Sequence, residues 1–279
     1  MATIIIHSNT LNFEQAKIIE RVYGYAGKPV KVNNHFRIQL NEAPTREELN
    51  QLANEIKVDI NLLPDGFDTS NVKLVISDMD STLIGIECID EIADYINVKP
   101  QVAAITEAAM RGELNFEESL TQRVALLKGL DTSALQKVFD DRLFLNPGAE
   151  TWISGLKEQS IKFALVSGGF TFFTDRLKEQ LGIDFTRANV LAKENHQLSG
   201  SVVGDIVGAQ AKADFLNELC QQLNIQPNQV IAVGDGANDL LMMNEAGLSI
   251  AYKAKPAVQE KAATALNFSG LDAILDFIV

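Results

Sequence analysis

Residues 73–82 read KLVISDMDST, an apolar run that ends in two aspartates, Asp78 and Asp80, and then two hydroxyl side chains. Runs of five to eight residues that are rich in β-branched side chains are typical of buried strands. Helical patterns separate this run from later ones, so the sequence predicts an α/β fold with a doubly wound, Rossmann-like parallel sheet. The later runs are KFALVS at 162–167, VIAVG at 230–234 and GLSIAY at 247–252.

The segment between the first two predicted strands, about 86–145, has a different character. Its apolar residues recur at helical spacing throughout, which predicts a wholly helical insertion. The tripeptide NPG at 146–148 marks the return to the sheet. Farther on, 190–203 has a turn at about Asn195 and favours a small antiparallel hairpin.

The first 65 residues predict a small N-terminal α/β domain, joined to the domain 66–279 by the turn-rich stretch PDGFDTSN at 64–71. Thr45 and Glu48 form a capping-box pattern at the start of its second helix, and Gly27 lies near the end of its first. The predicted strands lie at 3–6, 35–40 and 59–64, and the predicted helices at 13–27 and 45–58.

Polar residues follow the predicted strands of the larger domain at their carboxyl ends, where open α/β sheets bind ligands. We therefore expect them to converge on one crevice. The set comprises Asp78 and Asp80 after the first strand, Ser167 and Gly168 at the second, Asp235, Asn238 and Asp239 after the third, and Lys212 in a helix.

Four carboxylates in one crevice repel one another, and a divalent cation removes that conflict. Oxygen ligands suit Mg²⁺ rather than zinc, and Mg²⁺ is commonly held by one or two carboxylates together with a substrate phosphate. Glycine backbone N–H groups and Lys212 add sites for an anion. These residues predict a phosphate site with Mg²⁺.

The paired acids Asp78 and Asp80 also suit the chemistry of phosphate-ester hydrolysis. A carboxylate nucleophile divides this slow reaction into two steps through an aspartyl-phosphate. One of the two acids would attack phosphorus while the other protonates the leaving alkoxide and then activates water. A solvated turn at the end of a strand is the plainer interpretation of the pair, but the other motifs disfavour it.

The ordered motifs DMDST, VSGG, a downstream lysine and GDGAND resemble the haloacid dehalogenase superfamily and, within it, the phosphoserine phosphatase family. The resemblance covers about three quarters of the chain, from about residue 72. It implies a core at 72–85 and 146–279 and a helical cap at about 86–145. It also implies that Asp78 is the nucleophile and Asp80 the general acid and base, with O-phospho-L-serine hydrolysed to L-serine and phosphate as the last step of serine biosynthesis.

The resemblance assigns roles to the remaining site residues. It implies that Mg²⁺ is held by Asp78, the Asp80 backbone carbonyl and Asp235, with Asp239 supporting the metal and Lys212 from behind. The phosphate would be bound by Ser167, Gly168 and Lys212, and Asn238 would contact the ligand. In the cap, Glu87 would hold the amine of the substrate and Arg123 its carboxylate, with Met110 and Phe116 closing over the site.

Plainer interpretations remain for the cap residues: Glu87 lies in an acidic helix start, and Met110 and Phe116 suit a helical core. A phosphatase for another small phosphate monoester is the alternative function. The glycines of GDGAND mimic a dinucleotide fingerprint, but the third glycine is missing, so we reject a nicotinamide site. Residues 1–65 alternate strand and helix like regulatory amino-acid-binding domains, which leaves serine binding or a homodimer through this segment as hypotheses.

Composition excludes other classes of protein. The net charge of −13 disfavours nucleic acid and anionic membranes as partners. No apolar run approaches the roughly 18 residues of a membrane helix, and the start MATIIIHSNT lacks the basic region of a secretory signal. The two cysteines, Cys88 and Cys220, have no metal-type spacing, which fits a reducing cytoplasm. The three histidines have no partner at a useful spacing, and we expect them at the surface or in the N-terminal domain.

Overall fold

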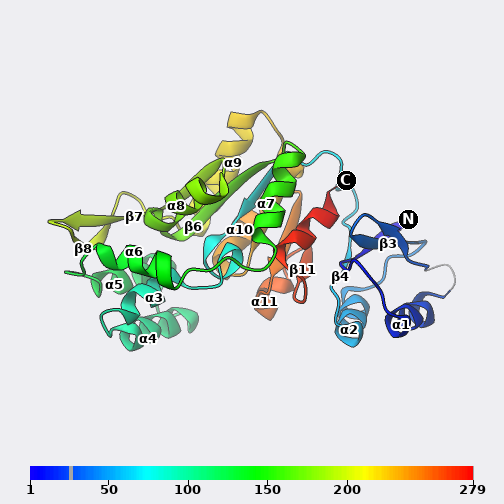
Figure 1. Ribbon diagram of the computed structural model, residues 1–279, viewed down its shortest axis with the longest axis horizontal. Coiled ribbons are helices and arrows are strands. Elements are labelled where there is room, and N and C mark those ends of the chain that lie inside the picture. The colour runs from blue at the N-terminus through cyan, green and yellow to red at the C-terminus, as the bar shows by residue number, and fades with distance from the viewer. Residues whose placement is uncertain (25–27, 279) are drawn as a thin grey trace.

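Two β-sheets organise the chain in the computed structural model, which describes residues 1–24 and 28–278 and, for Met110, the backbone alone (Figure 1). The smaller sheet is antiparallel and has the strand order β2-β3-β1-β4. Its elements are β1 (Ala2–Ile6), α1 (Phe13–Tyr23), β2 (Val30–Val32), β3 (His35–Leu40), α2 (Arg46–Ile56) and β4 (Ile60–Leu62).

The predicted elements of this N-terminal part are present, with two differences. Helix α1 ends at Tyr23 and is capped by Gly24 with a positive φ of 65°, while Gly27 lies outside the described residues. Strand β2 was not predicted, because its three residues are exposed or half-buried and form no buried apolar run. The capping box of Thr45 and Glu48 is confirmed, since each side chain accepts a hydrogen bond from the other residue's backbone N–H.

The larger sheet has seven strands in the order β11-β10-β9-β5-β6-β7-β8, with β5 near its centre. All neighbouring pairs are parallel except β7 and β8, so the predicted doubly wound parallel sheet is confirmed. Its strands are β5 (Leu74–Ser77), β6 (Lys162–Phe170), β7 (Phe185–Glu194), β8 (Gln197–Val203), β9 (Val230–Gly234), β10 (Leu248–Tyr252) and β11 (Thr264–Leu266).

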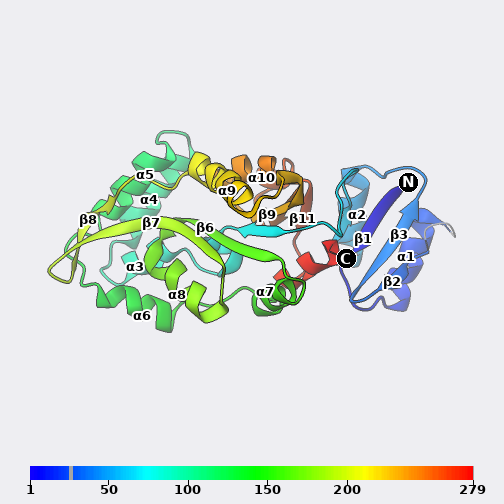
Figure 2. The same ribbon diagram turned by 90° about the horizontal axis from the view of Figure 1, so that it is seen from above.

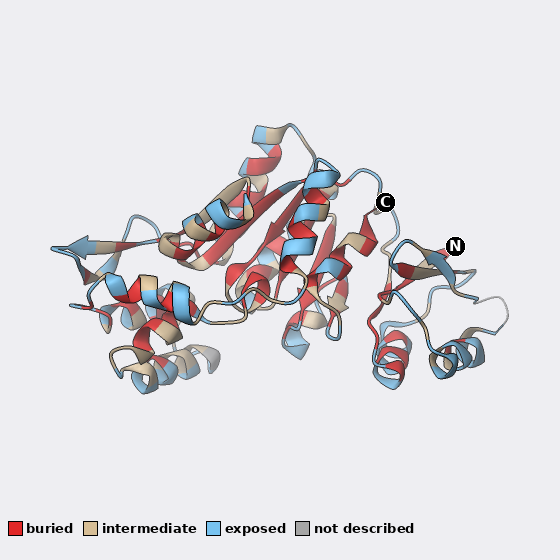
Figure 3. Ribbon diagram, in the orientation of Figure 1, coloured by how far each residue is buried: buried red, intermediate tan, exposed pale blue. Residues whose placement is uncertain are grey.

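Helices cover both faces of this sheet (Figure 2). Val75 of β5 faces the helices α7 (Ala149–Glu158) and α8 (Thr171–Leu181), whereas Leu74 and Ile76 face α9 (Ala209–Leu223) and α10 (Leu240–Glu245). Strand side chains that alternate between two covered faces leave no polar face, which explains the continuous apolar runs in the sequence. The buried residues accordingly concentrate in the sheet and the helix faces turned towards it (Figure 3).

The insertion after β5 is helical, as predicted, but it is completed by another part of the chain. The hairpin of β7 and β8 extends beyond the sheet and packs on α5 (Phe116–Ala125). In the segment after this helix, Gly129 N–H donates to the Leu198 carbonyl and Leu198 N–H donates to the Leu130 carbonyl. The sequence predicted the hairpin without this association. The helices of the insertion are α3 (Cys88–Asp94), α4 (Lys99–Met110), α5 (Phe116–Ala125) and α6 (Ser133–Asp141).

The smaller sheet is joined to the larger one by buried polar contacts. Asp59 accepts hydrogen bonds from the N–H groups of Asn267, Phe268 and Ser269 at 2.7–2.9 Å. Asn61 pairs with the backbone of Ala265 through both ends of its amide, each at 2.9 Å. The N-terminal sheet is thereby attached to the strand β11 and the segment that follows it.

Two histidines in this contact have a partner that the sequence did not reveal. His7 and His35 are buried, and both lie on the carboxylate of Asp276, at 2.9 and 3.1 Å from their Nδ1 atoms. Burial raises the pKa of Asp276, but the hydrogen bonds from His35 and His7 outweigh it and hold the pKa below its usual range. Across the described ranges, no helix has the length and apolar character that crossing a bilayer requires.

Candidate active site

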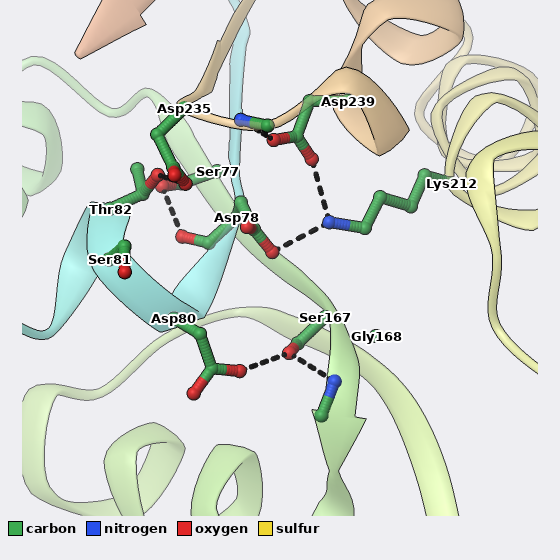
Figure 4. Close-up of polar contacts among 12 residues, drawn as sticks. Ser77, Asp78, Asp80, Ser81, Thr82, Ser167, Gly168, Lys212, Asp235 and Asp239 are labelled. Atoms are coloured by element: carbon green, nitrogen blue, oxygen red, sulfur yellow. Dashed lines mark hydrogen bonds and ion pairs between the residues drawn. The ribbon is translucent and has the colours of Figure 1, made fainter. Parts of the chain in front are cut away.

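Asp78 directly follows strand β5, and the chain then forms an irregular turn, η2 (Met79–Leu83). The hydroxyl of Ser77 donates to the Asp78 carbonyl at 2.7 Å. Ser81 adopts the left-handed conformation with φ of 59°, which is uncommon for a residue with a side chain. The turn directs Asp78 and Asp80 to different partners, as Figure 4 shows.

Asp78 lies against the ammonium of Lys212, which comes from the first turns of α9. The Nζ atom of Lys212 donates to Asp78 Oδ1 at 2.6 Å and to Asp239 Oδ1 at 2.7 Å, and its side chain is fully buried. Burial alone lowers the pKa of Lys212, but Asp239 and Asp78 outweigh it, so the net pKa lies above the ordinary value. Lys212 is therefore a permanent positive charge in the site.

The carboxylates around Lys212 outnumber it. One oxygen from each of Asp78, Asp235 and Asp239 lies within 4.8 Å of the others, and the Thr82 hydroxyl donates to Asp235 Oδ1 at 2.9 Å. Burial first, and the charge of Asp239 second, raise the pKa of Asp78 well above its usual range and that of Asp235 to about 6. Two or more negative charges against one ammonium leave a surplus that a divalent cation would neutralise, so the donor set fits a metal ion.

Asp80 lies on the other side of the crevice, next to the end of β6. Its Oδ1 accepts from the Cys88 N–H at 2.8 Å, and its Oδ2 from the Ser167 hydroxyl at 3.1 Å. Ser167 Oγ in turn accepts from the Gly169 N–H at 2.7 Å. Burial raises the pKa of Asp80, against the lowering effect of these hydrogen bonds. A carboxyl with a raised pKa is suited to give up a proton during a reaction.

The glycines of this loop bring the backbone close to reactive groups. A Cβ atom on Gly169 would lie 2.6 Å from Asp80 Oδ2, and one on Gly168 would lie 2.7 Å from the ring of Phe116. The first distance explains why the loop needs glycine to reach Asp80. The second shows that α5 of the insertion contacts the loop directly.

A cavity of about 810 Å³ opens between the sheet edge and the helical insertion. Its walls include Asp78, Asp80 and Asp235 at the sheet edge. On the insertion they include Glu87 and Arg123. The cavity is thus lined by a carboxylate cluster from the sheet edge and by an acidic and a basic side chain from the insertion.

The two charged residues of the insertion have distinct surroundings. Glu87 accepts a hydrogen bond from the Ser81 hydroxyl at 2.6 Å, and burial together with the charge of Asp80 raises its pKa to about 7. Burial lowers the pKa of Arg123, which the carboxylate of Asp90 partly offsets. Arg123 makes one side-chain hydrogen bond, a long one of 3.4 Å from its Nε to the Ser119 carbonyl. Within the part of the chain that the structure describes, the other guanidinium N–H groups of Arg123 have no protein acceptor at hydrogen-bond distance.

The residues predicted from the sequence meet in this one region, with one exception. The side chain of Met110 lies outside what the structure describes. Lys212, Ser167 and Asp239 lie behind the cavity surface, and the remainder line it: Asp78, Asp80, Glu87, Phe116, Arg123, Gly168, Asp235 and Asn238. Sequence reasoning missed Thr82 and Asp90, although Thr82 follows the two acids in the opening motif.

Comparison with known proteins agrees with this arrangement. The model of a haloacid dehalogenase-like hydrolase family matches residues 72–247, so the fold and site define a hydrolase of this class. The phosphoserine phosphatase of Polaromonas sp. is 53% identical over 224 residues, 78% of this chain and 95% of that protein. The chain therefore belongs to the haloacid dehalogenase-like hydrolases and, among them, to the phosphoserine phosphatase family.

Solved structures give the same result. A crystal structure of a probable phosphoserine phosphatase from Vibrio cholerae superposes with a TM-score of 0.86 at 37% identity, covering 99% of this chain and 86% of that one. A structure described as a phospho-aspartyl intermediate analogue of phosphoserine phosphatase has a TM-score of 0.71 at 41% identity, and covers 75% of this chain and all of that one. The first of these matches extends over the N-terminal sheet as well.

Proposed function

We propose that this protein is a Mg²⁺-dependent phosphoserine phosphatase, which hydrolyses O-phospho-L-serine to L-serine and phosphate in the last step of serine biosynthesis. The observation that carries the proposal is that two sets of charged groups line one cavity. Buried carboxylates and Lys212 lie at the sheet edge, and Glu87 and Arg123 lie on the insertion that faces it. Phosphoserine has a phosphate at one end and an ammonium and a carboxylate at the other, so its charges match both sets of groups.

The reaction uses the two acids of β5 in turn. An oxygen of Asp78 attacks phosphorus and forms the aspartyl P–O bond, while the bond from phosphorus to the serine oxygen breaks. Asp80, protonated at the outset, gives its proton to that departing oxygen. Asp80 then takes a proton from water, whose oxygen attacks phosphorus and breaks the aspartyl bond, so that Asp78 is restored. The raised pKa of Asp80 supports this role.

Asp78, the backbone carbonyl of Asp80, and Asp235 would hold Mg²⁺. When bound, the ion neutralises the negative charge of the carboxylates and of the phosphate. Asp239 shares its carboxylate between Lys212, at 2.7 Å, and the Gly236 N–H, at 3.0 Å, which supports a role behind the metal ligands. Lys212, Ser167 and the Gly168 N–H bind the phosphate, and Asn238 contacts the ligand from the cavity wall.

On the side of the insertion, Glu87 accepts the substrate ammonium and Arg123 binds its carboxylate in a bidentate manner. An ammonium beside Glu87 favours the ionised form and so lowers the pKa that burial has raised. Phe116 contacts Gly168 in the loop of residues 167–169, here called the phosphate loop. We propose that Phe116 excludes water from the closed site, and we assign the same role to Met110. A phosphate monoester without an ammonium and a carboxylate would leave this pair of charges unused.

The test of the substrate is a phosphate-release assay over a panel of small phosphate esters, with phosphoserine expected to be preferred. In Arg123→Ala, we expect KM for phosphoserine to rise about 10- to 150-fold, because a charge-assisted hydrogen-bond pair is lost. KM for p-nitrophenyl phosphate, which has no carboxylate, should change less than about threefold. The exposed Lys137→Ala on α6 of the insertion is the control. An equal rise in KM for both substrates would show that Arg123 does not bind the substrate carboxylate.

Metal binding should show a specific pH dependence. The pKa of Asp235 is about 6 in the fold against about 3.9 in an unfolded chain, so the folded state binds more protons between these values. With chelator present, the melting temperature should therefore fall as the pH rises from about 4 to about 7. Mg²⁺ favours the ionised carboxylates, and the rise in melting temperature that it causes should be larger at pH 8 than at pH 5. The measurement is calorimetry at both pH values.

Sodium chloride at matched ionic strength is the control for general screening. If Mg²⁺ raised the melting temperature equally at pH 5 and pH 8, these carboxylates would not be the metal ligands.

We propose a separate role for residues 1–65, as a domain that mediates a homodimer or binds a regulatory amino acid. Its sheet ends in the edge strand β2, where Val30 is exposed, and such an edge is able to pair with another chain. Sedimentation of the full chain gives the oligomeric state directly. We further propose a cytoplasmic location, which the two buried cysteines without a disulfide support.

A further inference from the structure

Asn189 on β7 has a buried side chain that the chemistry described so far does not use. It is 2% exposed and does not line the cavity. Its Nδ2 donates to the Gly168 carbonyl at 2.8 Å, and its Oδ1 accepts from the Val207 N–H at 2.8 Å. The amide thus joins the end of β6 to the segment that leads into α9.

The contact with Gly168 compensates for an irregularity in the sheet. Strands β6 and β7 pair in register as far as Val166 and Arg187, and again at Phe170 and Asn189. Between these two paired positions β6 therefore spans four residues (170 − 166), whereas β7 spans only two (189 − 187). The loop between them leaves the ladder and loses its strand partners. Asn189 supplies a donor to one carbonyl in this loop.

The peptide that joins Gly168 and Gly169 is consequently held at both ends. Its oxygen accepts from Asn189, and its N–H donates to Ser167 Oγ. Because a peptide unit is planar, fixing the oxygen fixes the direction of the N–H. Because Ser167 Oγ accepts from this N–H, the hydroxyl proton of Ser167 is directed towards Asp80, and the hydroxyl donates to Asp80 Oδ2 at 3.1 Å.

The contact with Val207 acts on the other phosphate-binding element. Val207 directly precedes Gly208, whose carbonyl accepts from the Lys212 N–H at 3.1 Å in the first turn of α9. The helix that carries Lys212 therefore begins at Ala209, two residues after the N–H that Asn189 holds. One side chain fixes the backbone beside Ser167 and the backbone before Lys212.

We propose that Asn189 is a positioning residue, which sets the Ser167 hydroxyl against Asp80 and the start of α9 relative to the phosphate loop. The inference rests on the proposed function in one respect, that a phosphate group occupies the space between Ser167 and Lys212. Asn189 acts on the groups that bind the phosphate and on no group that binds the rest of the ester. Its effect is therefore independent of what the ester carries at the other end.

The test is Asn189→Asp, which has nearly the same shape and keeps the acceptor for Val207. Its second oxygen, when ionised, faces the Gly168 carbonyl with no proton to donate. We expect kcat/KM to fall about 10- to 100-fold at pH 8, equally for phosphoserine and for p-nitrophenyl phosphate. At pH 5.5 a buried aspartate is largely protonated and donates again, so the ratio of variant to wild type should recover at least about threefold.

Two further variants separate positioning from a loss of structure. Asn189→Ala removes both contacts, so its kcat/KM should be lowered at pH 8 and should not recover relative to the wild type at pH 5.5. Asn195→Asp makes the same substitution at the exposed turn of the same hairpin, and should match the wild type at both pH values. A constant ratio of Asn189→Asp to wild type across pH, or a loss confined to phosphoserine, would overturn the proposal.

The two substrates also separate this inference from the proposed function. Cleavage of p-nitrophenyl phosphate without cleavage of phosphoserine would reject phosphoserine as the substrate and still test Asn189. Binding of inorganic phosphate in the presence of Mg²⁺, followed by calorimetry, gives a readout without turnover. Asn189→Asp should weaken it by a similar factor at pH 8, and unchanged binding there counts against the proposal.

Discussion

Asp78→Asn should lower the rate of phosphoserine hydrolysis by at least about 10⁴-fold, because a neutral amide oxygen is a poor nucleophile towards phosphorus. The variant should fold, since burial and the neighbouring Asp239 already disfavour a negative charge at this position. Phosphate release measures the rate. Acid quenching after mixing with phosphate-labelled substrate should trap label on the wild-type protein and none on the variant.

The exposed Asp65→Asn is the matched control and should retain full activity and labelling. Activity of Asp78→Asn within tenfold of the wild type would mean that another group attacks phosphorus. Label retained by the variant would lead to the same conclusion.

Lys212→Met should have the largest effect on stability. It leaves the buried carboxylates of Asp78 and Asp239 without the ammonium that lies 2.6 and 2.7 Å from them. Removing one partner of a buried ion pair costs about 3–5 kcal/mol of the free energy of unfolding. Activity should be lost as well, because the phosphate loses its fixed positive charge. Denaturant unfolding with chelator present measures the first effect, and phosphate release the second.

The loss of stability in Lys212→Met should depend on pH. The pKa of Asp78 is already raised in the fold, and without Lys212 it rises further, so the folded variant retains protons that the unfolded chain releases above about pH 3.9. The destabilisation should therefore be small at pH 4.5 and grow as the pH rises towards 8. Lys261→Met, at an exposed position, should be neutral throughout. A destabilisation that is the same at both pH values would show that lost packing, rather than unpaired charge, is responsible.

The core of the larger sheet and most of the site could be predicted from the sequence for one physical reason. Parallel strands buried on both faces appear as continuous apolar runs, and their carboxyl ends share one edge, so polar residues directly after the runs must meet. Asp78, Ser167 and Asp235 satisfy that rule and lie together. Lys212 does not follow a strand, so the resemblance to a family of known proteins, rather than this rule, supported its place in the site.

Other features could not be predicted because they depend on pairing between distant segments. Strand β11 has three residues, and its place is set by its pairing with β10. His7 has Asp276 as its partner, and the two residues are 269 positions apart along the chain. Asn189 reads as an ordinary polar residue in a strand, since the carbonyl that needs it is exposed only by an irregular register in β6. No local pattern encodes such a relation.

The attachment of Asp59 to the N–H groups of 267–269 has a consequence during synthesis of the chain. The ribosome releases the carboxylate about 208 residues before its partners (267 − 59), and at about 5–20 residues per second this interval lasts roughly 10–40 s. Throughout it the small sheet has neither its hydrogen-bond donors nor the apolar surface that covers Ile5. The nascent protein therefore passes through a stage in which its earliest segment has an unprotected face, and this stage is where we expect a chaperone to act.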